Sequence, residues 1–273
     1  MTSLTTVHQR PKGVVDPAAA GRMFRLARYV PSVALAPFLD HYWVVEWDLR
    51  DKPAYVQRTL PYPCVNLVFD AGRSAVFGVP TGAFDYVLED AGKVLGLRFR
   101  AGAFRAFIDR PAHTLTDQVV PLADLFPFDA ISAELAVLGA RDDAAMIAQA
   151  ENLLSAALPQ ADPQVERIAR ILQIAEQAPG LTQVADLAAA AGIGMRALQQ
   201  LFSDYVGVSP KWVIRRYRLH EAADRLANGG EIDLSTLALN LGYFDQAHFT
   251  SDFHKLVGKP PAEYRRAAKA AGV

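Results

Sequence analysis

The C-terminal half of the chain repeats itself, and this repeat restricts the fold more than any other feature of the sequence. Each unit contains a helix-forming segment, a turn with glycine, a second helix-forming segment, a further glycine and a segment that starts at proline. Helix, short glycine-containing turn and helix is the pattern of a helix-turn-helix motif. Two copies in tandem are far more specific than one. Val184, Leu187, Ala188 and Gly192 recur as Leu234, Leu237, Ala238 and Gly242, and then Leu198, Phe202, Gly207, Pro210 and Arg215 recur as Phe249, Phe253, Gly258, Pro261 and Arg266.

The second helix of each unit is predicted to have an apolar stripe and, opposite it, a strip without Glu or Lys. Helical spacing places the apolar residues on one face, which packs inward. Asp245 is well suited to cap the helix of the second unit. The stripes are Leu198, Leu201, Phe202 and Tyr205 in the first unit and Phe249, Phe253, Leu256 and Val257 in the second. The opposite strips are Met195, Arg196, Gln199 and Gln200, and then Gln246, Ala247, Thr250 and Ser251.

The composition of these strips indicates DNA reading. A helix face that only meets water favours Glu and Lys, whereas Arg pairs with guanine, Gln with adenine, and Ala or Thr methyl groups pack on thymine. The alternative is an ordinary polar helix face, which a matching strip in both units makes the weaker interpretation. We therefore predict that all eight residues of the two strips read base edges.

The segment between the units, about 209–230, is predicted to be a long helix that holds the two reading helices apart. Ser209 and Pro210 suit its start, and Gly229 with Gly230 suits its end. About 19 helical residues span roughly 28 Å, close to one turn of B-DNA at roughly 34–36 Å. Basic residues beside the reading strips would then neutralise phosphates, although each alone could equally be solvated surface: Lys211, Arg215, Arg216, His248, Lys259, Arg265 and Arg266.

A metal site in the second unit is the competing interpretation of its histidines. His248 and His254 lie six residues apart, which places them on different faces of a helix. A metal site needs three or four converging ligands. We therefore predict no metal and no cofactor, and we assign His248 to a phosphate contact.

The N-terminal half has a different residue pattern, and together with the helical C-terminal half it indicates an α+β protein. Short runs rich in Val, Phe, Tyr and Trp alternate with turn residues over residues 22–100, which is typical of a β-rich domain. Helix-like segments follow from about Ala103, and the polar segment 158–164 reads as a linker. The expected division is a β-rich domain with trailing helices at 1–160 and an all-α domain at 161–273.

The overall composition limits the remaining classes. The formal net charge is −1, so charge alone does not reveal a nucleic-acid-binding protein. Cys64 is the only cysteine, which rules out a disulfide within the chain. The N-terminus lacks the apolar core of a signal peptide, and no run is long enough to span a membrane. A cytoplasmic protein without membrane association is expected.

The segment "LGYFDQAHFTSDFHKLVGKPPAEYRR", residues 241–266, closely resembles the C-terminal signature of the AraC/XylS family of bacterial transcription regulators. The resemblance covers about residues 165–266. Its skeleton stands here as Gly242-Tyr243, then Asp245-Gln246-Ala247-His248-Phe249, then Phe253-His254-Lys255 with Gly258 and Pro261. It implies double-stranded DNA as a partner, base contacts on the two strips, and RNA polymerase as a partner if the protein activates transcription.

Two departures from the family pattern and the weaker N-terminal resemblance qualify these expectations. Phe244 stands where a small polar residue is usual, and Ser251 stands where a basic residue is common, so the second helix is expected to contribute less affinity.

The N-terminal half resembles the β-rich sensor domains that precede such DNA-binding units. In the family these domains hold a small effector in a cupin-like barrel or mediate dimerisation.

An effector cavity is therefore one hypothesis for the β-rich half, with plain β-core as the alternative for each residue. An enzymatic function of this half has no support in the sequence, because His8, His41 and His113 are dispersed and no phosphate-binding or nucleophile motif is present. Cys64 fits a buried structural thiol better than a nucleophile. The candidate cavity residues are Trp43, Trp47, Tyr62, Cys64, Phe69 and Phe99.

Two classes of function remain, with an enzyme fused to a DNA-binding unit as a remote third. One is a regulator that responds to a small effector through the β-rich half. The other is a constitutive or partner-driven DNA-binding protein whose β-rich half only dimerises. A homodimer could form through the helix expected at 142–157, whose apolar residues share one face, or through the β-rich domain beside it: Met146, Ala150, Leu153, Leu154 and Leu158.

Overall fold

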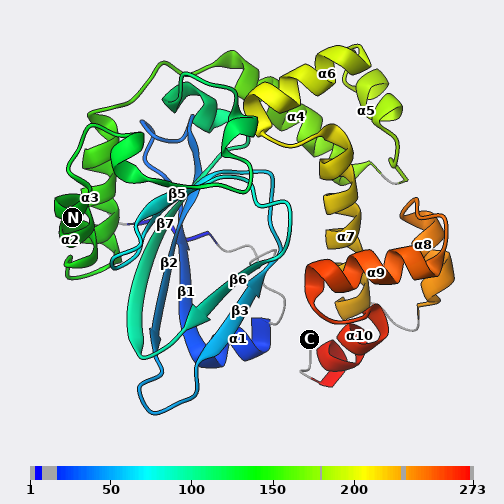
Figure 1. Ribbon diagram of the computed structural model, residues 1–273, viewed down its shortest axis with the longest axis horizontal. Coiled ribbons are helices and arrows are strands. Elements are labelled where there is room, and N and C mark those ends of the chain that lie inside the picture. The colour runs from blue at the N-terminus through cyan, green and yellow to red at the C-terminus, as the bar shows by residue number, and fades with distance from the viewer. Residues whose placement is uncertain (1–3, 8–16, 179, 229–231, 271–273) are drawn as a thin grey trace.

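The computed structural model describes residues 4–7, 17–178, 180–228 and 232–270. Strands and helices divide along the chain as the α+β class requires. A β-rich part precedes an all-helical part, and Figure 1 shows the two side by side, with α7 on the side of the helical part that faces the β-rich part. The predicted fold class is confirmed.

The β-rich part is built on an antiparallel six-stranded sheet in the order β1-β2-β7-β4-β5-β8. A separate pair, β3 and β6, is also antiparallel. Short helix α1 (Pro17–Met23) leads into β1. The strands are β1 (Phe24–Tyr29), β2 (Leu39–Asp48), β3 (Tyr55–Thr59), β4 (Asn66–Phe69), β5 (Ala75–Phe77), β6 (Phe84–Leu88), β7 (Ala91–Phe99) and β8 (Val119–Pro121).

Alternation along the strands gives the sheet two buried faces. Tyr42, Val44 and Leu97 face a core that includes residues of α2 (Ala130–Leu138) and α3 (Asp143–Ser155). Trp43 and Trp47 face the opposite way, into a second cluster with residues of β3 and β6. Figure 1 shows α2 and α3 on one side of the sheet and the β3–β6 pair on the other.

Two glycines of β7 make room for the tryptophans of β2. Gly96 pairs with Trp43 and Gly92 with Trp47 across the two strands. A Cβ at either glycine would overlap the indole ring of its partner. Both indole N–H groups are satisfied, because Trp43 donates to Asn66 at 3.3 Å and Trp47 donates to the Glu89 carbonyl at 2.9 Å. The glycines are therefore a packing requirement of this face.

Replacing Gly96 by alanine should lower the free energy of unfolding by roughly 1–3 kcal/mol, the usual cost of overpacking a core. Urea unfolding of the full chain measures the change. Gly21→Ala is the matched control, because its Cβ would meet no atom within 4 Å. An unchanged unfolding midpoint for Gly96→Ala would show that the Trp43 ring moves without cost.

The segments after β7 differ in part from the helices that the sequence predicts. Residues 103–107 and 122–124, in segments expected to be helical, form short 3₁₀ turns, η1 and η3, and residues 112–115 form a further one, η2. Pro111 and Pro121 stand directly before two of them, where the missing N–H of proline is tolerated. The helices expected further along are present as α2 and α3, each capped by an aspartate, Asp129 and Asp142.

The helical part repeats its geometry as it repeats its sequence. Gly192 and Gly242 take positive φ in the turns, and Gly207 and Gly258 take positive φ where the two reading helices end. This backbone region favours glycine, which explains why these positions recur. The helices are α4 (Pro163–Gln177), α5 (Val184–Ala190), α6 (Met195–Leu201), a π-helical turn η4 (Phe202–Val206), α7 (Pro210–Asn228), α8 (Leu234–Asn240), α9 (Gln246–Val257) and α10 (Pro261–Ala270).

Each helix-turn-helix unit has its own core, and α7 contributes to both. The first core holds Leu187, Leu198 and Phe202 with Val213 of α7. The second holds Leu237, Phe249 and Phe253 with Leu226 near the other end of α7. The long helix predicted at about 209–230 is present and links the two units.

The β-rich and helical parts pack closely on each other. Val79 joins the first helical core and Leu60 joins the second. Thr116 Oγ1 donates to the Gly207 carbonyl at 2.5 Å. The last helix of the first part ends at Ser155 and α4 begins at Pro163. The division into domains at residues 160 and 161 stays a prediction.

Candidate DNA interface

The first reading helix, α6, presents its predicted strip to solvent. Met195, Arg196, Gln199 and Gln200 are all exposed, and Met195 is 53% exposed despite its apolar side chain. Leu198 and Phe202 on the opposite face are fully buried. Gln200 Nε2 donates to Asp204 at 3.0 Å, which fixes one of the two glutamines along the helix surface. The strip is therefore open to solvent.

The second reading helix, α9, has the same arrangement. Gln246, Ala247 and Ser251 are exposed and Thr250 is half-buried, while Phe249 and Phe253 are fully buried. Asp245 caps the helix by accepting from the backbone N–H of His248 at 2.7 Å. Gln246 is the first residue of α9, and its Oε1 accepts a hydrogen bond from the Ser235 hydroxyl at 2.7 Å. This bond holds the side-chain amide of Gln246 in one orientation.

Helix α7 separates the two reading helices. It has 19 residues, which corresponds to about 28 Å. In Figure 1, α6 lies near one end of α7 and α9 crosses near the other. The length of α7 is therefore of the order of one turn of B-DNA, roughly 34–36 Å.

Arg215, predicted to contact phosphate, is tied to the second reading helix. Its Nη2 donates to the carboxylate of Asp252 in α9. The Asp252 side chain is buried, and His248 Nε2 lies 3.5 Å from the same carboxylate oxygen. Arg215 thus holds α7 and α9 together, a role the sequence did not show.

Arg216 was predicted to contact phosphate, but the structure buries it against the β-rich part. It is only 6% exposed, and its Nη2 donates to the Thr81 carbonyl of the β-rich part at 2.7 Å. Its guanidinium carbon lies 4.5 Å from the ring centre of Trp212. Burial, with the neighbouring charge of Arg215, lowers the pKa of Arg216 to about 10. The side chain faces the other half of the protein and not an open groove.

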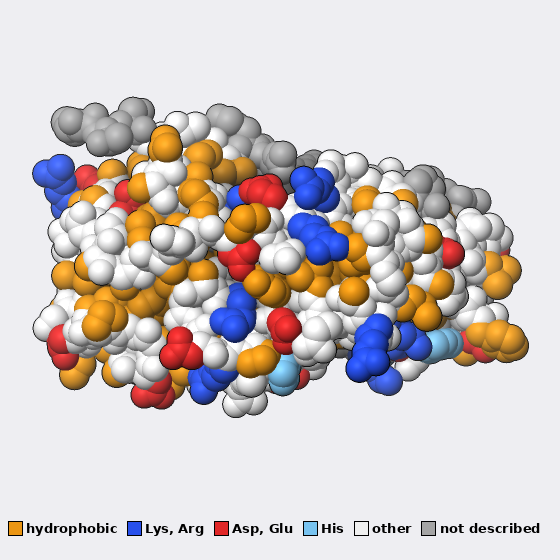
Figure 2. Space-filling view, turned by 90° about the horizontal axis from the view of Figure 1, so that it is seen from above, with side chains coloured by type: hydrophobic (Ala, Val, Ile, Leu, Met, Phe, Trp, Pro, Cys, Tyr) orange, Lys and Arg blue, Asp and Glu red, His pale blue; other side chains and the backbone are white. Residues whose placement is uncertain are grey.

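The remaining basic residues differ in their exposure to solvent and in their hydrogen bonds. Lys211 and Arg266 are exposed, His248 is exposed, and Lys259 is half-buried. Arg265 is half-buried and donates to the Ile232 carbonyl at 3.0 Å. Their phosphate contacts stay a prediction. In Figure 2, Lys and Arg side chains are interspersed with acidic and apolar ones and form no continuous basic surface on that face.

The six residues predicted for an effector cavity do not line one cavity. Phe69 and Phe99 lie in the core under α2 and α3, whereas Trp43 and Trp47 lie on the opposite face of the sheet. Tyr62 packs its ring 4.4 Å from the ring centre of His220 in α7. The hypothesis of a single aromatic cavity is wrong, because strand alternation sends these side chains to different sides.

The surroundings of Cys64 disfavour a nucleophilic role. Cys64 is buried, and burial raises the pKa of its thiol, which disfavours the nucleophilic thiolate. Within the described ranges, no group of three or more His, Cys, Asp and Glu residues is placed to hold a metal ion. Over the same part of the chain, no helix combines the length and apolarity of a membrane span.

The apolar face assigned to a homodimer is used inside the protein. Met146, Ala150 and Leu154 of α3 are buried in the core of the β-rich part. Leu153 and Leu158 are partly buried against the same core. Dimerisation through this face is therefore excluded while the domain stays folded as described.

Sequence reasoning noted Phe244 but did not assign it a role. It lies in the turn just before Asp245 and is 90% exposed. A large apolar side chain at a turn that leads into a reading helix is the signal that marks it. The exposed Leu239 at the end of α8 lies nearby in sequence.

Two family models match the chain. Residues 187–267 match a helix-turn-helix domain, and residues 27–121 match a family described as a domain of unknown function, DUF6597. The helix-turn-helix match begins within α5 and ends within α10. It therefore contains both reading helices.

Curated relatives match over a limited part of their length. A putative AraC-like transcription regulator from Streptomyces lividans is 32% identical over 83 residues, which cover 30% of this chain and 27% of that protein. The transcriptional activator RhrA from Rhizobium meliloti (strain 1021) is 33% identical over 107 residues, which cover 38% of this chain and 34% of that protein. The chain thus spans about a third or less of these relatives.

Among solved structures, an AraC-type transcriptional regulator from Chromobacterium violaceum matches at 22% identity, with 38% of this chain and 94% of that chain covered and a TM-score of 0.35. The matched helix-turn-helix family and the curated relatives agree with the C-terminal signature in the sequence. The C-terminal part of this chain is therefore an AraC-type helix-turn-helix domain, preceded by a β-rich domain of a family described only as of unknown function.

Proposed function

We propose that this protein is a transcription regulator that binds a specific duplex DNA sequence through α6 and α9 together. The observation that carries the proposal is the pair of exposed, uncharged or basic strips on two equivalent helices at the ends of one 19-residue helix. Arg196 would pair with guanine and the glutamines with adenine. Lys211, Lys259 and Arg266 would fix the register on the phosphates.

The two strips differ in sequence, so one protomer should read an asymmetric site. Selection of bound sequences from a random duplex pool by the full chain tests the proposal. The expected result is one enriched motif without internal symmetry, protected in footprinting as two successive major-groove segments on one face. Affinity should also fall steeply with salt. Enrichment of no motif, with equal binding to all duplexes, would exclude sequence-specific regulation.

Phe244 is expected to add a contact that reads thymine. Its exposed ring stands beside the start of α9, where the helix would enter the groove, and apolar side chains recognise the thymine methyl group. Phe244→Ser should weaken binding to the preferred site by about 1 kcal/mol, the lower range for one base pair, and should remove a thymine preference at one position. Repeating the pool selection with the variant measures this.

Leu239→Ser is the matched control for Phe244→Ser, because Leu239 is also exposed, at 63%, but lies at the end of the first helix of the unit. Its selected motif should equal that of the wild type. Thermal unfolding of both variants should match the wild type, since neither side chain is buried. An unaltered motif for Phe244→Ser would place its ring away from the bases.

A response to a small effector through the β-rich part is the finer proposal. It is supported by the direct packing of the β5–β6 loop on α7, through which a change in one part can reach the other. The constitutive alternative leaves the β-rich part as a dimerisation domain. Ile131 and Leu135 of α2, both exposed, offer a surface for a homodimer. Light scattering at micromolar concentration separates monomer from dimer. RNA polymerase is a partner only if the protein activates transcription.

A further inference from the structure

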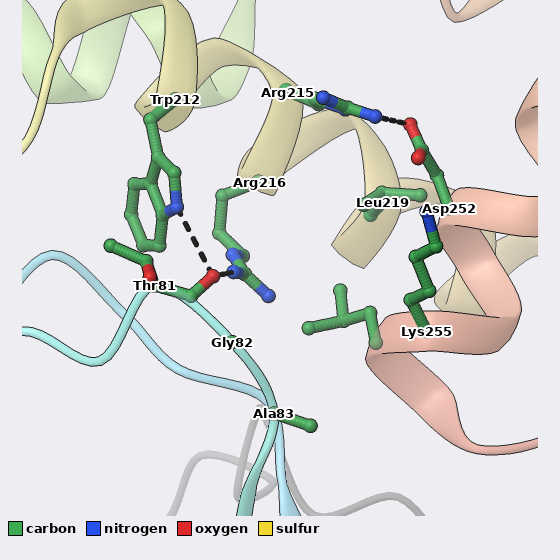
Figure 3. Close-up of a pocket in the computed structure, with 10 residues that line it drawn as sticks. Thr81, Gly82, Ala83, Trp212, Arg215, Arg216, Leu219, Asp252 and Lys255 are labelled. Atoms are coloured by element: carbon green, nitrogen blue, oxygen red, sulfur yellow. Dashed lines mark hydrogen bonds and ion pairs between the residues drawn. The ribbon is translucent and has the colours of Figure 1, made fainter. Parts of the chain in front are cut away.

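A cavity of about 160 Å³ lies between the β-rich part and the second helix-turn-helix unit. Three elements form its wall: the β5–β6 loop, α7 and α9. Figure 3 shows the loop on one side and the two helices around the space. The loop is anchored from behind, because the backbone N–H and the hydroxyl of Thr81 both donate to Asp117, at 2.6 and 2.7 Å. The lining includes Gly82, Ala83, Arg216, Leu219, Lys255 and Leu256.

Arg216 has an unsatisfied nitrogen at this cavity. Its Nη2 donates to the Thr81 carbonyl, but Nη1 is buried and has no hydrogen-bond partner among the described residues. In Figure 3 the second terminal nitrogen of Arg216 points away from Thr81 toward the open space. Buried polar groups in native proteins are nearly always paired, and an unpaired one carries a desolvation cost. Nη1 therefore calls for an acceptor that the described chain does not supply.

The charges around the cavity do not balance. Arg215 is paired with Asp252, the only carboxylate among the residues that line the cavity. Arg216 and Lys255 form no ion pair within the described part of the chain, and Lys255 lies across the space from Arg216 in Figure 3. Burial beside another cation lowers the pKa of Arg216, which reflects the same lack of a counter-charge. The cavity is therefore electropositive and walled in part by apolar groups, Leu219 and Leu256.

We propose that this cavity binds a small oxyanion, a carboxylate or phosphate group, held between Nη1 of Arg216 and the ammonium group of Lys255. A guanidinium N–H donates well to either oxyanion, and a lysine supplies a point charge. A short apolar part of the ligand would pack on Leu219 and Leu256. One water occupies about 30 Å³ of liquid volume, so the space suits a ligand of a few non-hydrogen atoms.

The site exists only while the loop and both helices are assembled. An anion bound there would contact Arg216 of α7, whose other terminal nitrogen donates to the Thr81 carbonyl of the β-rich part, and Lys255 of α9. A ligand that binds only the assembled protein raises its stability by mass action. The bound anion would thus bridge α7 and α9 beside the β5–β6 loop. This inference concerns anion binding by the chain alone and does not depend on DNA binding.

Thermal unfolding of the full chain tests the proposal, with three titrations at matched ionic strength: sodium phosphate, sodium butyrate and sodium chloride. Either phosphate or butyrate should raise Tm in a saturable way, by about 5–10 °C at a hundredfold excess over Kd. The more effective of the two identifies the oxyanion. Equal effects of all three salts would overturn the proposal, because they would indicate a general salt effect and a cavity that holds only water.

Variants place the binding at the cavity. Lys255→Met should fold normally, because Lys255 is exposed, and should weaken anion binding about tenfold or more. Arg216→Lys should do the same by removing Nη1 while keeping the charge. Lys52→Met, an exposed lysine of the β2–β3 turn, should keep the wild-type Kd. An unchanged Kd in Lys255→Met would assign the anion to another part of the protein. No DNA is present in these titrations, so a negative result leaves the proposed DNA binding untouched.

Discussion

Replacing Arg196 or Gln199 by alanine is expected to relax base preference in one half of the DNA site. Both side chains project from the exposed strip of α6, while Leu198 and Phe202 on its other face are buried. Each should cost roughly 1–3 kcal/mol, the usual value of one bidentate base contact, which is about 5–150-fold in affinity for the preferred site. Affinity for unrelated sequences should change far less. Fluorescence anisotropy on the selected site and on its single-base variants measures both.

The control for these variants must be an arginine that lies away from both reading helices. Arg141, between α2 and α3 in the β-rich part, is well exposed and pairs only locally, with Asp142. Arg141→Ala should leave affinity and base preference unchanged. Thermal unfolding of Arg196→Ala and Gln199→Ala should equal the wild type. If Arg196→Ala weakens binding to every sequence alike, Arg196 contacts a phosphate, and the assignment of α6 as a base-reading helix fails.

Arg215 is unsuitable as the phosphate control that its position in the sequence suggests. The sequence alone predicts that Arg215→Ala weakens binding to all sequences equally without affecting stability. The ion pair with the buried Asp252 adds a second effect, because the variant would leave a buried carboxylate without its partner. A charge-assisted hydrogen bond contributes about 1.5–3 kcal/mol. A loss of DNA affinity in this variant would therefore mix a lost phosphate contact with a displaced α9.

The sequence was most informative where structure depends on neighbours along the chain. Helical periodicity sufficed to separate Phe249 and Phe253 from Gln246 and Ser251, because positions three and four apart share one face. The glycines of the repeat could be placed for the same reason, since Gly207 and Gly258 end equivalent helices with positive φ. The β-rich region was also predictable, because strands β2, β4, β5, β6 and β7 coincide with dense apolar runs bounded by turn residues.

Strands β1, β3 and β8 lack such a dense apolar run. Strand β1, with the sequence FRLARY, is mostly half-exposed and contains two arginines, one of which, Arg25, donates to Asp143 of α3 at 2.8 Å. Strand β3, with the sequence YVQRT, pairs only with β6 and buries none of its residues fully. Strand β8 has three residues and ends at a proline. Pairing partners distant in sequence, and not local composition, make these segments strands.

The errors at the candidate site have the same cause. Arg216 resembles any other arginine of a basic helix until Thr81, 135 residues earlier, meets it across the interface. The aromatic residues proposed for an effector cavity share a composition but not a face of the sheet. What a side chain can do was predictable, whereas which distant element faces it was not.

Replacing Phe253 by alanine is expected to unfold the second helix-turn-helix unit before the rest of the helical part. The ring is fully buried in the core formed by α8, α9, α10 and one end of α7, where it makes a tilted contact with Phe249 and an edge contact with Tyr264. A Phe→Ala change in such a core costs about 3–5 kcal/mol. This is a large share of the 5–15 kcal/mol that stabilises a typical domain. The footprint on the selected DNA should shrink from two major-groove segments to one.

Phe202→Ala supplies the matched comparison, because Phe202 is the equivalent residue of the first unit and is also fully buried. The two rings belong to separate cores that share only α7. Hydrogen exchange of the full chain should therefore show lost protection in α8, α9 and α10 for Phe253→Ala, and in α5 and α6 for Phe202→Ala, since local unfolding follows the cooperative unit that is weakened. Equal loss of protection across α4 to α10 in either variant would mean that α7 fuses both units into one cooperative core. The two reading helices would then be lost together, and neither half of the DNA site could be weakened alone through its core.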